Sequence, residues 1–218
     1  MIINVMIINL LHNIYGRVIM LLLVLFSFSA CKEEAIYYPK PRMYPKITFP
    51  ERKPAQMRAD YCDFSFNYPD YMQYVQDTVF LTKKSQHPCW FNLTMPIFSG
   101  DIHFTYTDIS AKTAEERADK VYKVYKDAYR FSDEHDKKAV LNEDFVINDP
   151  KRQLYGVLYN IEGHVASSFQ FVVTDSVRHA VRASLYFRSQ PNPDSMMPVI
   201  EFVKEDIMGI INSFEWKN

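Results

Sequence analysis

Apolar and polar side chains alternate along several segments in the first half of the chain. The clearest run starts at Phe64, and residues 89–95 and 102–106 keep the same period, with residues 77–82 a weaker candidate. A period of two puts all the apolar side chains of a strand on one face. The pattern therefore predicts antiparallel strands, each with one buried face.

The apolar period then changes to that of a helix. Thr113 and Glu116 have the spacing of a capping box, which opens such a helix. The apolar residues that share its predicted inner face are Ala114, Ala118, Val121, Tyr125 and Ala128. The outer face is basic and carries tyrosines, but acidic residues are interleaved with the lysines. It therefore predicts a solvated helix surface rather than a nucleic-acid or membrane patch.

The second half of the chain alternates again and then ends in a helix. Three runs, 155–161, 169–173 and 181–187, are separated by turn-like residues and predict a meander. The final helix has Pro198 near its first turn. Its predicted apolar face consists of Val199, Val203, Ile207, Ile210 and Phe214. The predicted fold class is α+β: an antiparallel β-sheet sandwich with two packed helices, one between the strand groups and one C-terminal.

The N-terminal segment has no alternation and instead resembles a lipoprotein signal. Arg17 precedes an apolar run over residues 18–28, and the tetrapeptide FSAC ends at Cys31. This order resembles a bacterial lipobox, so residues 1–30 predict a signal peptide whose removal leaves Cys31 as a lipidated N-terminus. The apolar run is shorter than the roughly 20 residues of a spanning helix, and a single-pass anchor is the alternative. Acyl chains such as palmitate would hold the protein at a membrane surface.

Residues 31–60 predict a proline-rich tether. The prolines are Pro39, Pro41, Pro45, Pro50 and Pro54. Proline blocks helices and central strands and favours extended polyproline II, so at ~3.1 Å per residue the tether could reach on the order of 90 Å. In the alternative, residues 36–38 and 47–49 pack on the domain as an edge. The rest, residues 61–218, is long enough for one core and predicts a single globular α+β domain.

Composition and charge exclude some classes of function. The 25 basic and 26 acidic residues nearly balance, so we expect no nucleic-acid partner. Only 5 glycines are present, and they form no phosphate-binding loop. The 15 tyrosines and 16 phenylalanines suit strands and protein contacts.

One short segment contains the residue types of a hydrolase triad. Asp175, Ser176 and His179 fall within five positions. Triads converge in space from separated segments, and neither a nucleophile elbow nor an oxyanion loop surrounds these residues. The segment therefore predicts a hairpin turn. His164, near two serines, is no stronger a candidate.

The other histidines and the paired acids give no site either. His87 and His103 lie in or beside predicted strands without a second ligand at metal-binding spacing. Glu143-Asp144 and Glu205-Asp206 are adjacent in sequence and point in different directions, which predicts solvated charges. The sequence predicts no catalytic residue, no metal site and no cofactor.

Cys62 and Cys89 predict a disulfide. Once Cys31 is acylated they are an even pair of thiols in an oxidising compartment, each at the start of a strand pattern. Closing this loop would stabilise the fold by roughly 3 kcal/mol in the chain-entropy description. Two buried free thiols are the alternative.

Several segments in order also carry a family resemblance. They are YPKPR at 38–42, CDFSF at 62–66, CWFN at 89–92, LYGVLYNIEG at 154–163, FQFVVTDS at 169–176, ASLYF at 183–187 and PVIEFVKED at 198–206. Together they resemble the gliding motility lipoprotein GldD family of Bacteroidota, from the lipobox to Trp216. His164 stands where the family pattern suggests asparagine, which affects a turn alone.

The resemblance implies a component needed for gliding motility and for the type IX secretion system. It implies no catalytic activity, so we expect a non-catalytic cell-envelope lipoprotein. It would act by protein–protein interaction with other envelope proteins of the apparatus, assembling or stabilising the machinery. An envelope ligand-binding lipoprotein is the first alternative and would need a concave pocket. An envelope hydrolase is the second and would need His164 or His179 to meet a nucleophile and an acid.

The same resemblance bears on location. A lipoprotein of this apparatus is expected to be lipid-anchored in the outer membrane and to face the periplasm. Lys32, Glu33 and Glu34, directly after the lipidation cysteine, are similar to the acidic export signal of surface lipoproteins in this phylum. The cell surface is therefore the alternative location.

Overall fold

The computed structural model describes most of the chain after residue 45 and a short segment before it. The described residues are 14–21, 46–57, 59–76, 79–80, 83–84, 87–136, 139–188 and 193–217. The chain divides into two compact units, Met1–Tyr44 and Pro45–Asn218. Within the first unit, residues 14–21 form a helical segment. Cys31, the prolines before Pro50 and the export-like signal at residues 32–34 lie outside the described residues.

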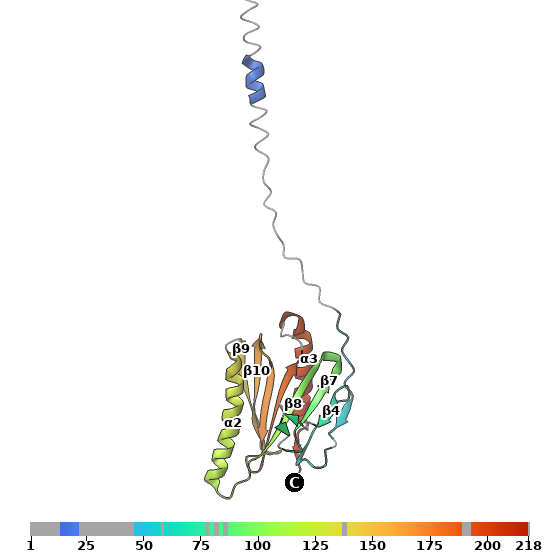
Figure 1. Cartoon of the computed structure of the whole chain (residues 1–218), viewed down its shortest axis with the longest axis vertical. Coiled ribbons are helices and arrows are strands. Elements are labelled where there is room, and N and C mark those ends of the chain that lie inside the picture. Colours follow the sequence, from blue (N-terminus) through green and yellow to red (C-terminus); the bar gives the residue numbers. More distant parts are fainter. Residues whose placement is uncertain are drawn as a thin grey trace, which may run out of the picture. The chain divides into compact units, whose positions relative to one another are not determined.

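A seven-stranded antiparallel sheet forms the centre of the second unit (Figure 1). In spatial order its strands are β4 (Gln73–Gln76), β7 (Phe91–Met95), β8 (Gly100–Asp108), β12 (His179–Phe187), β11 (Phe169–Thr174), β10 (Leu154–Gly163) and β9 (Ala139–Asp149). The alternation correctly predicted β7, β8 and the β10–β11–β12 meander, because buried and less buried residues alternate along β7 and most of β8 and β10. The predicted α+β fold class is confirmed.

Shorter elements complete the unit. A helix of the 3-10 type, η1 (Pro96–Phe98), links β7 to β8. The run that starts at Phe64 divides into β2 (Phe64–Ser65), which pairs with β13 (Glu215–Trp216), and β3 (Asn67–Pro69), which pairs with β1 (Pro54–Gln56). The weak candidate over residues 77–82 contains β5 (Val79–Phe80), which pairs with β6 (Lys83–Lys84).

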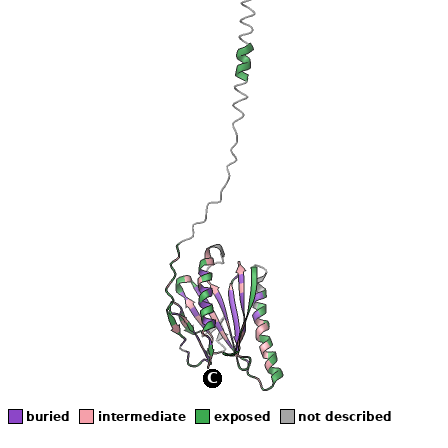
Figure 2. Cartoon of the chain, turned by 180° about the vertical axis from the view of Figure 1, so that it is seen from behind, coloured by how far each residue is buried: buried purple, intermediate pink, exposed green. Residues whose placement is uncertain are grey.

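The two long helices, α2 (Ala114–Asp136) and α3 (Pro193–Asn212), pack on opposite faces of the sheet. Leu158 of β10 belongs to the cluster that contains α3, whereas its neighbour Tyr159 belongs to the cluster that contains α2. Successive residues of a strand point to opposite faces, so the two helices cannot share one. The view coloured by burial shows buried strands between these layers (Figure 2).

Helix α2 begins as the capping box predicts, but it packs over less of its length than expected. The Glu116 backbone N–H donates to Thr113 Oγ1 at 3.1 Å, and the Glu116 carboxylate accepts the N–H of Lys112, one residue before the N-cap, at 3.2 Å. Ala114 and Ala118 are exposed, which corrects the predicted inner face. The helix contacts the sheet through its C-terminal half, and its first turns extend past the strands (Figure 1).

Helix α3 buries the predicted face completely. Val199, Val203, Ile207, Ile210 and Phe214 are each at most 6% exposed, although Phe214 lies two residues beyond the helix end. The helix begins at Pro193, so Pro198 is inside it rather than at its first turn.

An aromatic core joins the two ends of this unit. Phe64 of β2 stacks on Phe214 with ring centroids 5.4 Å apart, and Phe66 stacks on Phe104 at 5.2 Å. Phe91 and Phe104, on neighbouring strands, stack at 4.7 Å. All five rings are at most 2% exposed. Burial of large rings contributes strongly to stability, so this cluster holds the terminal strands to the sheet.

Candidate functional site

The triad-like residues form a turn. The Asp175 carboxylate oxygen Oδ1 accepts the backbone N–H groups of Val177, Arg178 and His179, each at 2.8 Å. Ser176 has a φ of 62°, a left-handed conformation common in turns. The hairpin-turn interpretation accounts for these residues, because the Asp175 carboxylate binds three backbone N–H groups of its own turn.

His179 packs inside the domain rather than in an open cleft. Its Nδ1 atom is 2.7 Å from the Tyr106 hydroxyl, and its ring stacks on Trp216 at 5.6 Å. The nearest carboxylate contact is long, 4.0 Å from Nε2 to Asp175 Oδ2. His179 therefore links β12 to β8 and β13.

Two of the other described histidines, His87 and His103, also make local contacts. The His87 Nδ1 accepts the Cys89 N–H at 3.1 Å, and burial lowers the pKa of this imidazole. His103 Nδ1 is 2.6 Å from Asn92 Oδ1 across neighbouring strands, and His164 is exposed after β10. Among the described residues, no group of three or more His, Cys, Asp or Glu side chains could hold a metal ion. Within the same ranges, no helix is long and apolar enough to cross a membrane.

The paired acids at Glu205 and Asp206 are not both solvated, which corrects the sequence prediction. The Glu205 side chain is 70% exposed, whereas that of Asp206 is 1% exposed. Asp206 lies on the inward side of α3 and receives a hydrogen bond from the Tyr71 hydroxyl. Burial raises the pKa of the Asp206 carboxyl, and the hydrogen bond from Tyr71 and the Arg52 charge partly offset this effect.

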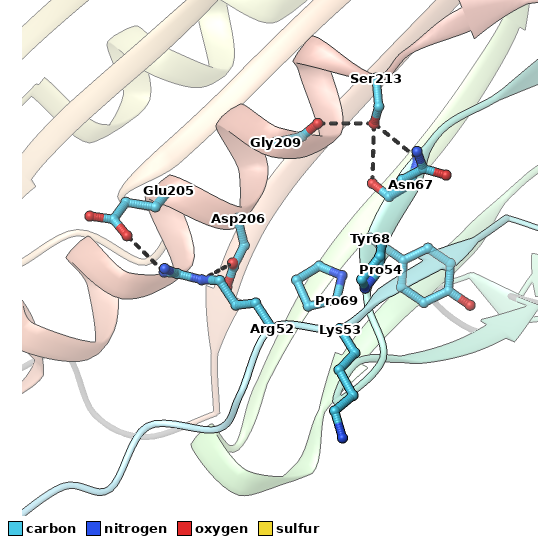
Figure 3. A pocket seen from close by; sticks show the side chains of 10 residues that line it. All are labelled: Arg52, Lys53, Pro54, Asn67, Tyr68, Pro69, Glu205, Asp206, Gly209 and Ser213. Carbon is cyan, nitrogen blue, oxygen red and sulfur yellow. Dashed lines mark hydrogen bonds and ion pairs between the residues drawn. The ribbon is translucent and has the colours of Figure 1, made fainter.

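The segment before β1 is clamped onto α3 through these residues (Figure 3). Arg52 Nε donates to Asp206 Oδ1 at 2.5 Å, and its Nη2 lies 2.8 Å from Glu205 Oε2. The guanidinium also lies 3.9 Å from the Phe202 ring centroid, and Phe49 stacks on that ring at 4.5 Å. Residues 46–53, which we call the arm, therefore pack on the rest of the domain. This agrees with the second interpretation of the sequence, in which residues 47–49 pack on the domain instead of belonging to a free tether.

A groove of about 350 Å³ lies beside the clamp, between α3 and the β1–β3 pair. Figure 3 shows its polar groups bound to one another: Arg52 to Glu205 and Asp206, and Ser213 to Gly209 and Asn67. Ligand pockets use convergent polar groups to orient what they bind. Here those groups hold the arm, β3 and α3 together, which gives the groove a structural role.

We expect Arg52→Ala to loosen the arm. Removing one partner of a buried pair leaves an uncompensated carboxylate, but Arg52 is 38% exposed and partly screened. The free energy of unfolding should therefore fall by about 1–2 kcal/mol, measured by urea denaturation of the domain. Lys53→Ala is the matched control, because its ion pair with Glu51 is exposed. Equal effects of the two substitutions would contradict the clamp.

The raised pKa of Asp206 also sets a pH dependence. Because the pKa of the Asp206 carboxyl is higher in the folded than in the unfolded protein, protonation of Asp206 stabilises the folded state. This stabilisation is fully present at low pH and is lost as the pH rises from about 4 through the folded-state pKa. Without Arg52 the carboxylate is less compensated, so the loss of stability over this window should be steeper. Denaturation midpoints between pH 4 and 7 test the slope.

The structure joins Cys62 and Cys89 in a disulfide, with Cα atoms 5.6 Å apart. This distance lies within the range that a disulfide can bridge. The bond ties the loop before β2 to the loop before β7, at the edge of the aromatic core.

Reduction of this bond should lower the melting temperature of the domain. The two cysteines are 27 positions apart, and opening this loop would lower the free energy of unfolding by roughly 3 kcal/mol in the chain-entropy description. Thermal unfolding with and without reductant measures the difference, with a Cys62→Ser/Cys89→Ser variant as the control that reductant should not affect. Two freely alkylatable thiols in the unreduced, denatured protein would refute the bond.

The fold and the site together define an α+β domain with a disulfide. Its polar clusters around Asp206 and Asp175 form hydrogen bonds within the domain and stabilise its structure. The chain belongs to the gliding motility lipoprotein GldD family, whose model matches residues 34–216. The family resemblance in the sequence is thereby confirmed. Membership gives the chain a role in gliding motility and an association with the cell envelope.

Two further comparisons complete the picture. Among solved structures, the chain is similar to cyanobacterial PsbP (CyanoP) from Synechocystis sp. PCC 6803, at a TM-score of 0.46 and 12% identity. The match covers 79% of this chain and 97% of that chain. A comparison with curated proteins finds no match.

Proposed function

We propose that this protein is a non-catalytic envelope lipoprotein that supports gliding motility and type IX secretion by binding other proteins of the apparatus. A signal peptide over residues 1–30 would direct export, and acyl chains on Cys31 would hold the protein in the outer membrane, facing the periplasm. The residues between Cys31 and the arm would act as a spacer. The domain would then bind its partners at a distance from the lipid surface.

One observation carries the proposal beyond family membership. The Asp175 carboxylate, the acid that a hydrolase would need, accepts three backbone N–H groups of its own turn. The other oxygen, Oδ2, lies 4.0 Å from His179 Nε2, beyond hydrogen-bond distance, and the His179 Nδ1 atom is 2.7 Å from the Tyr106 hydroxyl. The acid and the imidazole therefore do not form the hydrogen bond of a triad. This geometry favours a binding protein over a hydrolase.

Substitution of the catalytic-looking residues tests the proposal. His164→Ala, Ser176→Ala and His179→Ala should each restore colony spreading and extracellular cargo to a gene-deletion strain. His179→Ala should cost about 1 kcal/mol of stability, because it removes the contacts with Tyr106 and Trp216. Activity at wild-type protein levels should nevertheless be retained.

Protein abundance and localisation are the controls for this experiment. A stably expressed and correctly localised Ser176→Ala or His179→Ala protein that fails to rescue would favour an enzyme. A His179→Ala protein that fails because its abundance falls would instead show a structural role for His179. In that case His179→Asn, which keeps a polar side chain at this position, should partly restore the abundance.

A further inference from the structure

The edge strand β9 is long, exposed and unusually apolar. It spans 11 residues, Ala139–Asp149, and pairs with β10 on one side, while the sheet order ends there. Its exposed apolar residues are Val140 at 85%, Val146 at 77%, Phe145 at 50% and Leu141 at 40%. Figure 2 shows this strand as exposed beside the buried strands of the sheet.

Apolar side chains lie on both faces of this edge. Val146 is opposite Val157, on the face that α2 covers, and Phe145 is opposite Leu158, on the face that α3 covers. Along an edge strand, alternate N–H and C=O groups also point outward without a strand to bind. An added strand could therefore form main-chain hydrogen bonds and bury apolar surface of β9.

Three common protections of an edge strand, namely short length, lysine and proline, are absent from β9. Natural edge strands are kept short or carry lysine and proline, and residues 139–149 contain neither. The register irregularity of the β9–β10 pair lies between Glu162 and Gly163, opposite the N-terminal end of β9. The other edge of the sheet, β4, has 4 residues. The two edges therefore differ, and β9 is the edge suited to pairing.

The charges of β9 indicate which partner fits. The strand carries Glu143, Asp144 and Asp149 and no basic residue. Asp149 pairs with Arg152 at 2.8 Å, whereas no ion pair involves Glu143 or Asp144 among the described residues. A second copy of β9 would bring more carboxylates to the same seam and would be repelled. A basic strand would instead be attracted.

We propose that β9 binds an extended segment of a partner protein, in which apolar residues alternate with lysine or arginine, as an eighth strand of the sheet. This inference rests on the proposed binding function and names the surface and the class of partner. The basic side chains of the added strand would lie on one face, beside Asp144, and its apolar side chains would lie on the other face. There they would cover Leu141 and Phe145.

Peptide binding to the purified domain tests the proposal directly. The probes are two synthetic nonapeptides, one alternating valine with lysine and one alternating valine with glutamate. At low salt the lysine peptide should bind at least about tenfold more tightly and should slow amide hydrogen exchange over residues 139–149. Glu143→Lys/Asp144→Lys should reverse the preference between the peptides.

A matched variant and the cellular assay separate this proposal from the proposed function. Glu115→Lys/Asp119→Lys makes the same charge change on the exposed surface of α2 and should leave the peptide preference and colony spreading unchanged. Glu143→Lys/Asp144→Lys should lose spreading at normal abundance. Equal binding of both peptides, protection elsewhere, or self-association through β9 would overturn the docking strand. If the α2 variant and the three catalytic-looking variants still restore spreading, the binding function itself would stand.

Discussion

Phe64→Ala is expected to be among the most destabilising substitutions in the domain. Phe64 is 0% exposed and packs against Phe91, Tyr106, Phe214 and Trp216 at centroid distances of 5.4–6.3 Å. Truncation removes the ring and leaves a cavity between both termini of the domain and the sheet. The expected loss is about 4 kcal/mol in the free energy of unfolding, a large part of the stability of an ordinary domain.

Urea denaturation of the purified domain measures this loss. Phe64→Leu should cost less, because it keeps part of the apolar volume, and Tyr122→Ala is the control, since that ring is 66% exposed. The control should change stability by less than about 0.5 kcal/mol. A cost for Phe64→Ala below about 1 kcal/mol would mean that the aromatic core does not hold the terminal strands to the sheet.

Cys31→Ser should abolish lipid attachment. The thioether that carries the lipid requires the cysteine sulfur, which serine lacks. Each acyl methylene buried in the bilayer contributes about 0.8 kcal/mol, so loss of the chains removes the proposed anchor altogether. Labelling with an alkyne fatty acid should fall to background, and the protein should remain unprocessed or become soluble.

The control for this experiment is Cys62→Ser/Cys89→Ser, which removes the other two thiols and keeps Cys31. It should retain full labelling even though the domain is less stable. Undiminished labelling of the Cys31→Ser protein would show that Cys31 is not the lipidated residue.

The sheet and α3 could be predicted well because their patterns reflect burial. Strands such as β7 alternate between the core and a less buried face, and the apolar positions of α3 repeat with the period of a helix. Their side chains report directly on the core that surrounds them. Strand β9 was missed because it lies at an edge and most of its residues are exposed, so no buried face imposes an alternation on them.

The clamp on the arm could not be predicted for a different reason. Arg52 and Asp206 are 154 positions apart, and each looks like an ordinary surface charge in the sequence. Proline spacing suggested an extended tether, yet the extended chain at residues 46–53 packs along α3 through Phe49 and Arg52. The packing of the arm depends on contacts between segments that are far apart in the sequence, and local sequence patterns carry no information about such contacts.

Similarly, the relative positions of α2 and α3 follow from long-range packing. The sequence indicated an apolar face on each helix but not which face of the sheet each would cover. In the structure, Leu154 and Leu158 of β10 belong to the cluster that contains α3 residues, whereas Val157, Tyr159 and Ile161 belong to the cluster that contains α2 residues. Residues of β10 therefore alternate between two buried clusters rather than between a core and solvent. A period of two looks the same in both cases, so the pattern does not tell which helix covers which face.

The central claim of the proposed function is that this one envelope protein serves both gliding and type IX secretion. The most direct measurement scores colony spreading and extracellular cargo in the same gene-deletion strain, with and without the wild-type gene supplied in its place. We expect both activities to be lost together and restored together. Loss of spreading with cargo secretion intact, or no effect of the deletion on either, would contradict the account.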